Sequence, residues 1–360
     1  MSENKLQRSV YILLFLCLAF GGLYFAKGFL VPLTLAAIFS MLFIKLSNWF
    51  ESKSISRGIA SLLCIVLFFG AIATAIFLLS WQLSSLSENV DEMKNRLLEM
   101  LNGLRKWINQ TVGISWKEQE KMIKEQSQTG GASAGAMAMS FAGGAFSVLV
   151  NTVLVTVYMF LFLLYRRHIK NFILKLVEKD EKLLADEVVH KSGKVAQKYL
   201  SGMGAMIFVL WVMYGIGFSV IGVENAIFFA ILCGLLEIVP FIGNLTGTSI
   251  TVLSVLVQGG DSKMIIWVIL TYMVVQFLQT YILEPLIVGE QVNINPLFTI
   301  MSIVLGEMIW GIAGMILAIP LLGITKIICD HIPELKPYGF LIGPEKQKDK
   351  RQPLFSFKKG

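Results

Sequence analysis

Long apolar stretches separated by short polar segments dominate this chain of 360 residues. A membrane-spanning helix needs about 20 mostly apolar residues, and six stretches meet or approach that length. They are Ser9–Ala26, Phe29–Ile44, Gly58–Ser80, Met139–Tyr165, Gly202–Gly222 and Met264–Leu283. The pattern predicts an all-α, polytopic transmembrane protein.

Two longer apolar segments, Ala226–Gln258 and Leu297–Ile328, each hold one acid and a central Gly/Pro break. Each segment forms either two short crossings or one re-entrant hairpin, and in both cases it returns to the side it entered from. Together with the six simpler stretches they predict about eight spans. If the two segments are inverted repeats, the halves of a transport core would rock around breaks at Pro240 and Pro320.

The evidence for such a repeat is a shared spacing, G-x5-P-x2-G. It occurs at Gly234, Pro240 and Gly243, and again at Gly314, Pro320 and Gly323. Corresponding Gly/Pro-interrupted segments in two halves of a chain indicate a transporter's binding region. Three residues of common types also match by coincidence, so both interpretations stay open.

A polar insert over residues 81–138 separates the third and fourth predicted spans. Its apolar positions step by three and four along one helix: Leu83, Leu86, Val90, Met93, Leu97, Leu101, Leu104 and Ile108. We favour a coiled-coil-like contact between subunits of a homo-oligomer. The alternative is a helix lying on the membrane interface.

Composition agrees with a membrane protein, since 55% of residues are hydrophobic and only 15% are charged. The net charge of +7 lies in loops and tails beside apolar stretches, which indicates topology rather than nucleic-acid binding. The four cysteines are scattered and form no CxxC pair, so we expect core residues and neither a metal site nor a cofactor.

Basic residues predict the orientation, because cytoplasmic loops are enriched in Lys and Arg. Lys5 and Arg8 precede the first stretch, nine Lys/Arg lie between Arg166 and Lys198, and the tail is lysine-rich. Both termini are therefore expected in the cytoplasm, in a multi-pass protein of the cell inner membrane. The insert would lie outside, although long loops follow this rule poorly.

We divide the chain into five regions: 1–80, three membrane helices; 81–138, the polar helical insert; 139–200, a fourth membrane helix and an amphipathic cytoplasmic elbow; 201–330, a transport core; and 331–360, a basic tail. The first four helices and the insert would support oligomerisation. The transport core would hold the translocation path.

Three segments of the second half carry a family resemblance: GLLEIVPFIGN (Gly234–Asn244), YILEPLIVGEQVNINPL (Tyr281–Leu297) and GEMIWGIAGMILAIPL (Gly306–Leu321). Together they resemble the autoinducer-2 exporter family, also called PerM-like permeases. Two positions depart from that pattern: Asn244 stands where the family often has proline, and Asn295 where it often has histidine. The resemblance implies export of a small polar or signalling molecule, and in some members sodium(lithium)/proton antiport.

Glu237 is the leading candidate for a functional residue, because it is the one ionisable residue between Asn225 and Gly260. A carboxylate at membrane depth is costly and is usually retained for work on ions, protons or substrate. The alternative is a carboxylate that caps backbone N–H groups at the helix break.

Other candidates share polar or helix-breaking character within apolar segments. They are Pro240, Gly243, Asn244, Gln276, Gln279, Glu284, Glu307, Gly311, Gly314 and Pro320, with Asn293 and Asn295 as further oxygen donors or turn residues. The glutamines would face one cavity or bond between helices. Glu284 would line a vestibule or sit at the membrane surface.

The sequence gives no support for catalysis, since H-E-x-x-H and the phosphate-binding G-x-x-x-x-G-K-[ST] are missing, and its G-x-S-x-G match, Gly131–Gly135, lies in a Gly/Ala/Ser-rich stretch that indicates a hinge. We therefore expect a transporter and not an enzyme, with a small molecule or cation and the lipid bilayer as partners. Two other classes stay open: a passive oligomeric pore and a structural protein of membrane assembly.

Overall fold

The computed structural model describes residues 3–87, 134–240, 242–288 and 294–344, and all regular secondary structure in these ranges is helical. The first helices are α1 (Glu3–Phe25), α2 (Lys27–Ser52), α3 (Arg57–Ser87) and α6 (Ala134–Lys175). A 3-10 turn, η1 (Lys179–Glu181), leads into α7 (Lys182–Ile221). The remaining elements are α8 (Ala226–Leu236), α9 (Ile242–Val257), α10 (Ser262–Leu278), the π-helix η2 (Gln279–Val288), α11 (Pro296–Trp310), α12 (Ile312–His331), η4 (Pro333–Leu335) and α13 (Lys336–Ile342).

Seven helices of the described ranges are long and apolar enough to cross a membrane. Six of them contain the six stretches expected from the sequence, and the seventh is α12. Three further apolar helices, α8, α9 and α11, are shorter than a span. The prediction of an all-α, polytopic membrane protein is confirmed.

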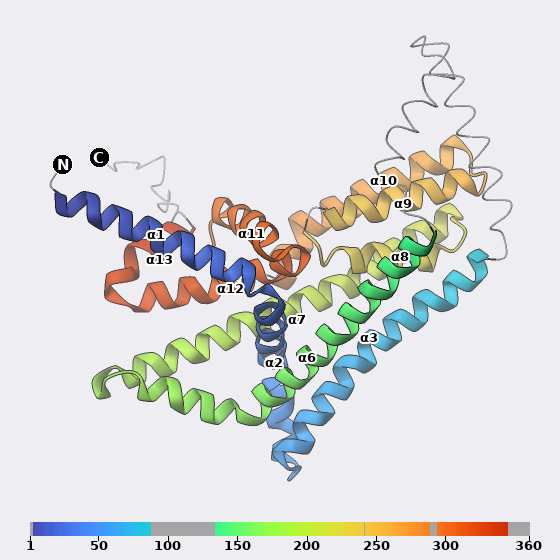
Figure 1. Ribbon diagram of the computed structural model, residues 1–360. Coiled ribbons are helices and arrows are strands. Elements are labelled where there is room, and N and C mark those ends of the chain that lie inside the picture. The colour runs from blue at the N-terminus through green and yellow to red at the C-terminus, as the bar shows by residue number, and fades with distance from the viewer. Residues whose placement is uncertain (1–2, 88–133, 241, 289–293, 345–360) are drawn as a thin grey trace, which may run out of the picture.

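Helices α2, α3 and α6 pack against one another as one group (Figure 1). Ala36, Cys64, Met159 and Leu163 form its buried centre. Phe39 and Phe68 pack beside them with ring centroids 4.9 Å apart. Outward-facing side chains of these helices are apolar and exposed, as lipid contact requires.

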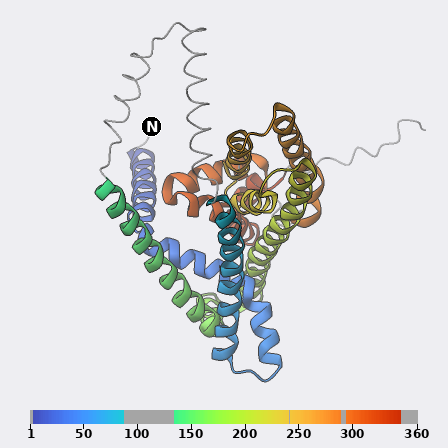
Figure 2. The same ribbon diagram turned by 90° about the vertical axis from the view of Figure 1, so that its right-hand side faces the viewer.

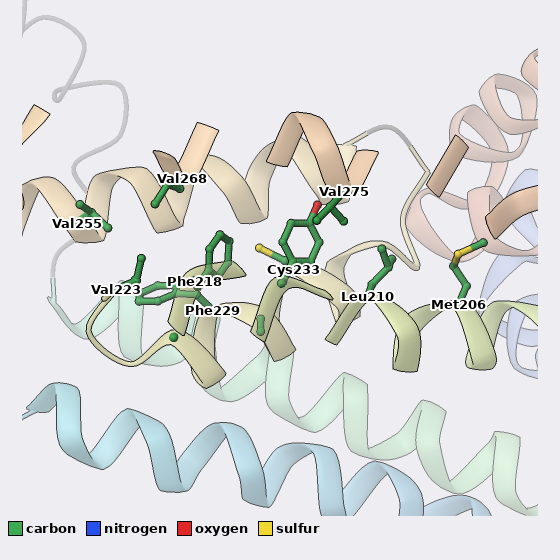
Figure 3. Close-up of a cluster of buried hydrophobic side chains, with 12 residues drawn as sticks. Met206, Leu210, Phe218, Val223, Phe229, Cys233, Val255, Val268 and Val275 are labelled. Atoms are coloured by element: carbon green, nitrogen blue, oxygen red, sulfur yellow. The ribbon is translucent and has the colours of Figure 1, made fainter. Parts of the chain in front are cut away.

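The helix α7 is central to the rest of the molecule, because it packs against α2, α8, α10 and α12. Its Phe218 meets Phe229 of α8, Val255 of α9 and Val268 of α10 in the largest buried cluster (Figure 3). A smaller cluster of Ile38, Ala196 and Leu317 joins α2, α7 and α12. The two halves of the chain are thus held together through α7.

The expected elbow after the fourth span is a hairpin. The end of α6 and the start of α7 continue the two spans and meet through η1, at the lower left of Figure 1. Lys170 of α6 pairs with Asp186 of α7 at 2.6 Å. At the end of the third span, α3 continues as a helix to Ser87. The insert's apolar positions from Val90 to Ile108 lie outside the described residues.

The second broken segment is a helical hairpin, but its break is not where the proline predicts it. Pro320 is buried inside the continuous helix α12, so the prediction of a break there is wrong. The chain turns at Gly311, whose φ of +63° is disfavoured for residues with a side chain. Neighbouring helices compensate the bond that an intramembrane proline removes, which makes proline a weak marker of helix ends.

This difference also removes structural support for the proposed repeat. Pro240 separates α8 from α9, whereas Pro320, its counterpart by spacing, interrupts no helix. The two segments do share a hairpin form, since α8 packs on α9 and α11 packs on α12. Figure 2 gives a second view of this arrangement, with α11 and α12 in orange to red. The motif G-x5-P-x2-G therefore occupies two different structural contexts.

Candidate functional site

The break between α8 and α9 is a tight turn that follows from the sequence around Pro240. The N–H groups of Ile238 and Val239 bond to carbonyls three residues earlier, Leu235 O at 3.2 Å and Leu236 O at 2.9 Å. Pro240 has no N–H to donate, so one hydrogen bond of the helical ladder is missing at this turn. The chain resumes helical structure at Ile242.

Two glycines on α9 allow the hairpin to close tightly onto α8. A Cβ at Gly243 would collide with the backbone carbonyl of Leu236, and one at Gly247 would lie 3.0 Å from the Cα of Cys233. The two helices therefore approach at backbone distance. This approach seats the first turn of α9 beside the end of α8, where Glu237 lies.

Glu237 contacts a glutamine from a distant part of the chain. The side chain of Gln279 donates from Nε2 to Oε1 of Glu237 at 2.6 Å. Gln279 is only 3% exposed and begins η2 directly after α10. Glu237 Oε2 and Gln279 Oε1 are also buried, and neither atom has a hydrogen-bond partner among the described residues.

A second polar chain crosses the same helices. Tyr214 of α7 donates to Asn244 Oδ1 at 2.9 Å, and Asn244 Nδ2 donates to Gln276 Oε1. The chain ends where Gln276 Nε2 donates to Thr280 Oγ1 at 3.3 Å. Tyr214 is fully buried and Asn244 is 6% exposed, whereas Thr280 is exposed, so the chain of hydrogen bonds runs from the interior of the helical packing to its surface.

Four residues expected from the sequence are thus brought together: Glu237, Asn244, Gln276 and Gln279. Pro240 and Gly243 shape the turn between them. Tyr214 was not expected. The signal that points to it is a phenol within an otherwise apolar stretch, whose hydroxyl needs a partner when buried.

The remaining candidates take no part in these hydrogen bonds. Glu284 lies on η2 and Glu307 on α11, both exposed, and in the described part of the chain no hydrogen bond joins either side chain to Glu237. The backbone N–H of Gly311 bonds to the Glu307 carbonyl at 2.7 Å. Gly314 packs on Gly306 at backbone distance. Glu307, Gly311, Gly314 and Pro320 all belong to the α11–α12 hairpin.

Of the two asparagines before α11, only Asn295 lies within the described residues. Asn295 caps the helix by accepting from the N–H of Leu297 at 3.0 Å, and its own N–H donates to Ile342 O at 2.8 Å. Its contacts are those of a turn residue. Asn293 lies outside the described residues.

The two hairpins touch at one residue of the break. Val239 packs against Ile303, Met315 and Ala318 of the α11–α12 hairpin. The turn that carries Glu237 is therefore in contact with both α10–η2, through Gln279, and the second hairpin, through Val239.

The free atoms of the site define what it can bind. A carboxylate oxygen and an amide oxygen are acceptors, so a cation or a proton suits Glu237 Oε2 and Gln279 Oε1, whereas an anion does not. Glu237 has no ion-pair partner in the described ranges. The described residues also contain no group of three or more His, Cys, Asp or Glu that could hold a metal ion.

Comparison with known proteins gives a consistent result over almost the whole chain. The model of AI-2E family transporters matches residues 13–334. The chain is 24% identical to "Putative transport protein YrrI" of Bacillus subtilis (strain 168), covering 86% of this chain and 88% of the relative. It is 25% identical to "Putative permease PerM" of Escherichia coli (strain K12), covering 91% and 94%, and 23% identical to "Putative transport protein YhhT" of the same strain, covering 92% of each.

Proposed function

Because the chain belongs to the AI-2E family of membrane transporters, we propose that the α8–α9 break holds the site at which it binds a coupling ion or its substrate. The protein would export a small polar or signalling molecule, driven by a proton or sodium gradient. Glu237 would carry the proton or bind the cation in each cycle. Asn244, Gln276 and Gln279 would orient the groups around it.

The observation that supports this proposal is the pair of buried acceptor atoms, Glu237 Oε2 and Gln279 Oε1. A buried polar atom without a partner costs roughly 1–3 kcal/mol, and more when it is charged. A structural role gives no reason to keep two such atoms together. A site that takes up a proton or a cation does.

The alternative role for Glu237, a cap on backbone N–H groups, has less support. The hydrogen bond found for this carboxylate within the described residues comes from the side chain of Gln279, 42 positions away. A cap would accept from the N–H groups of its own turn. The N–H groups of Ile238 and Val239 bond to backbone carbonyls instead.

Sodium(lithium)/proton antiport is a second candidate function, and the same atoms favour it. Oxygen ligands suit hard cations, and a single carboxylate can bind either a cation or a proton in turn. In such a transporter the two ions would compete for Glu237. A passive oligomeric pore and a structural assembly protein remain alternatives that need neither binding nor competition.

The wider setting of the site is part of the proposal. Residues 201–330 would form the transport core, and residues 1–200 would support a homo-oligomer in the inner membrane. Both termini would be cytoplasmic, because six simple spans and two hairpins that return to their own side return the chain to where it began. The basic segments at Lys53–Arg57 and Arg166–Lys198 would then face the cytoplasm, as the positive-inside rule requires.

A flux assay in proteoliposomes tests the function. The purified full-length protein would be reconstituted with candidate solutes inside and with a proton gradient, a sodium gradient or neither. We expect saturable flux that rises with one of the gradients. Flux that is linear in solute concentration and indifferent to both gradients would support the pore, and no flux of any solute or ion would support the structural role.

A further inference from the structure

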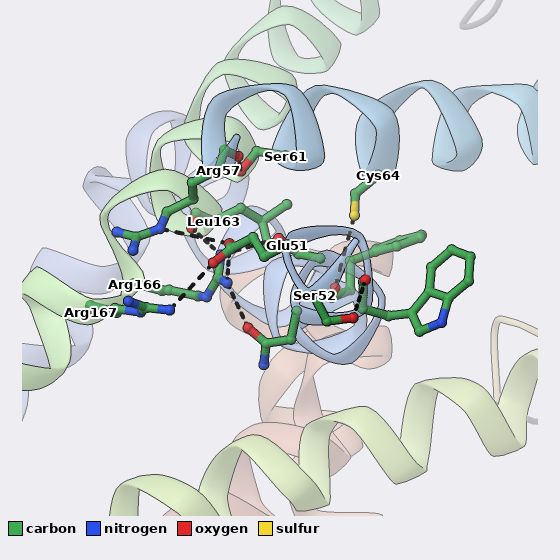
Figure 4. A network of polar contacts seen from close by, with 12 residues as sticks. Glu51, Ser52, Arg57, Ser61, Cys64, Leu163, Arg166 and Arg167 are labelled. Atoms are coloured by element: carbon green, nitrogen blue, oxygen red, sulfur yellow. Dashed lines mark hydrogen bonds and ion pairs between the residues drawn. The ribbon is translucent and has the colours of Figure 1, made fainter. Parts of the chain in front are cut away.

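Where α2 ends and α3 begins, beside α6, three arginines surround one carboxylate. Glu51 of α2 accepts from Arg166, pairs with Arg167 at 3.4 Å and lies 3.7 Å from Arg57 of α3 (Figure 4). We call these four residues the arginine corner. With one negative and three positive charges, it keeps a formal charge of +2.

The three arginines differ in how many hydrogen bonds their guanidinium groups make. Arg166 is anchored, because its guanidinium also donates to Ser47 Oγ at 3.1 Å, Leu163 O at 2.9 Å and Asn48 Oδ1 at 2.6 Å. Its side chain is only 11% exposed. Arg166 therefore holds Glu51 in place and joins α6 to α2.

Arg57 and Arg167 retain donors for another partner. The side chain of Arg167 is 67% exposed and reaches Glu51 through one nitrogen. Arg57 is 33% exposed at its side chain, and the atom that faces Glu51 at 3.7 Å is its buried Nε, which makes no hydrogen bond with any described residue. Each guanidinium carries five N–H donors in a plane that matches the oxygens of a phosphate.

The surroundings are those of a membrane interface. Arg57 begins α3, and the apolar run of α6 ends just before Arg166. Trp49, 55% exposed on α2, suits the headgroup level. From Arg57 towards the membrane interior, α3 presents Ile59, Leu62 and Val66, which are 54–59% exposed. Their spacing of three and four places them on one lipid-facing stripe, on the opposite side of α3 from Ala60, Ser61 and Cys64, which are buried beneath Arg57.

We propose that the arginine corner binds the phosphate of an anionic phospholipid. Arg57 and Arg167 would hold the headgroup phosphate, and the acyl chains would extend into the bilayer beside the exposed apolar side chains of α3 and α6. The charge selects anionic lipids over zwitterionic ones, because a zwitterionic headgroup leaves the +2 of the corner uncompensated. The position of the corner at the membrane interface selects a lipid over a soluble phosphate. The site would join the lipid leaflet to α2, α3 and α6, independently of Glu237 and transport.

Native mass spectrometry of the full-length protein, released from nanodiscs of equal phosphatidylglycerol and phosphatidylcholine, tests this site. We expect the wild type to retain phosphatidylglycerol preferentially. Arg57→Gln/Arg167→Gln should lower the phosphatidylglycerol-to-phosphatidylcholine ratio by roughly tenfold, since each basic residue near an anionic surface contributes about a fivefold factor before losses to screening. The charge-matched control Lys194→Gln/Lys263→Gln removes two exposed lysines elsewhere and should leave the ratio unchanged.

Two further variants separate lipid binding from a structural role. Arg167→Gln alone changes a mostly exposed side chain and should lower the ratio with the fold intact. Glu51→Gln removes the competing carboxylate and should raise it. If Glu51→Gln lowers the ratio as the arginine changes do, the corner is only a structural ion-pair cluster and the proposal is wrong.

Soluble glycerophosphoglycerol, the headgroup without acyl chains, distinguishes a lipid from a soluble ligand. It should fail to displace phosphatidylglycerol at equal concentration, because it has no acyl chains to bury in the bilayer. Displacement by the headgroup alone, an unchanged ratio in both arginine variants, or an equal loss in the lysine control would each overturn the assignment.

Discussion

Gln279 donates a hydrogen bond of 2.6 Å to Glu237, and this contact joins the break between α8 and α9 to the point where α10 becomes the π-helix η2. The break interrupts the helical structure between α8 and α9, and η2 is a π-helix rather than an α-helix. Irregular backbone within a membrane protein is tolerated where protein or a water-filled cavity covers it, and π-helical turns frequently mark functional sites. The carboxylate and its partner amide thus sit between two departures from regular helix.

Glu237→Gln should reduce gradient-driven flux to the level of empty vesicles while expression and folding persist, because glutamine keeps the size but cannot carry the charge. Glu237→Asp should retain part of the flux, since the charge survives with a shorter reach. The measurement is solute or ion flux in proteoliposomes. Glu307→Gln, an exposed acid on α11, is the matched control and should transport like the wild type. Wild-type flux and ion dependence in Glu237→Gln would exclude the proposed site.

Gln279→Met should destabilise the protein by about 1.5–3 kcal/mol, because the buried carboxylate of Glu237 loses its hydrogen-bond donor. Thermal unfolding in detergent, followed by the loss of soluble protein, measures this. Gln7→Met, the same change at an exposed position of α1, should cost less than about 0.5 kcal/mol. Equal losses in the two variants would mean that the contact contributes no stability of its own.

Gly314→Ala should destabilise the α11–α12 hairpin, because the added Cβ would collide with the backbone carbonyl of Gly306. Overpacking of this kind costs about 1–3 kcal/mol. Gly204→Ala on α7 meets open space and should be neutral or stabilising by up to about 1 kcal/mol, since alanine is the better helix former. The two variants are therefore expected to shift the unfolding temperature in opposite directions.

Topology can be tested by cysteine labelling after replacement of the four cysteines, Cys17, Cys64, Cys233 and Cys329. In intact cells, an impermeant maleimide should label Lys263→Cys, which the proposed topology places outside. It should not label Lys350→Cys in the basic tail until the membrane is permeabilised. Labelling of the tail from outside would refute cytoplasmic termini.

The polar insert provides a test of oligomerisation. Leu97→Lys places a charge in the middle of the predicted apolar stripe, and burial of each leucine is worth about 1.5–3 kcal/mol. We expect native mass spectrometry to show fewer oligomers for this variant than for the wild type. Lys94→Gln, off the stripe, should leave the distribution unchanged, and an oligomer indifferent to Leu97→Lys would favour a helix on the membrane interface.

The sequence was sufficient to predict the spans and the polar residues of the candidate site, and insufficient to pair them. Apolar runs of span length are local features, and an isolated acid such as Glu237 stands out within one. That Gln279 faces Glu237 and Tyr214 faces Asn244 depends on how α7, α9 and α10 pack, which no local pattern contains. The predicted break at Pro320 is wrong because a membrane helix packed among others can contain a proline without ending there. The chain turns at Gly311 instead, and no neighbouring proline marks that position.

Val239 makes the carboxylate site sensitive to a distant displacement. Two residues from Glu237, it is packed among Ile303, Met315 and Ala318 of the second hairpin. Close-packed side chains have low compressibility, so a shift of α11 against α12 would press on the turn that holds Val239. The distance from Glu237 to Gln279 would change with it. A rearrangement on one hairpin would thus alter the ionisation equilibrium on the other without any ligand passing between them.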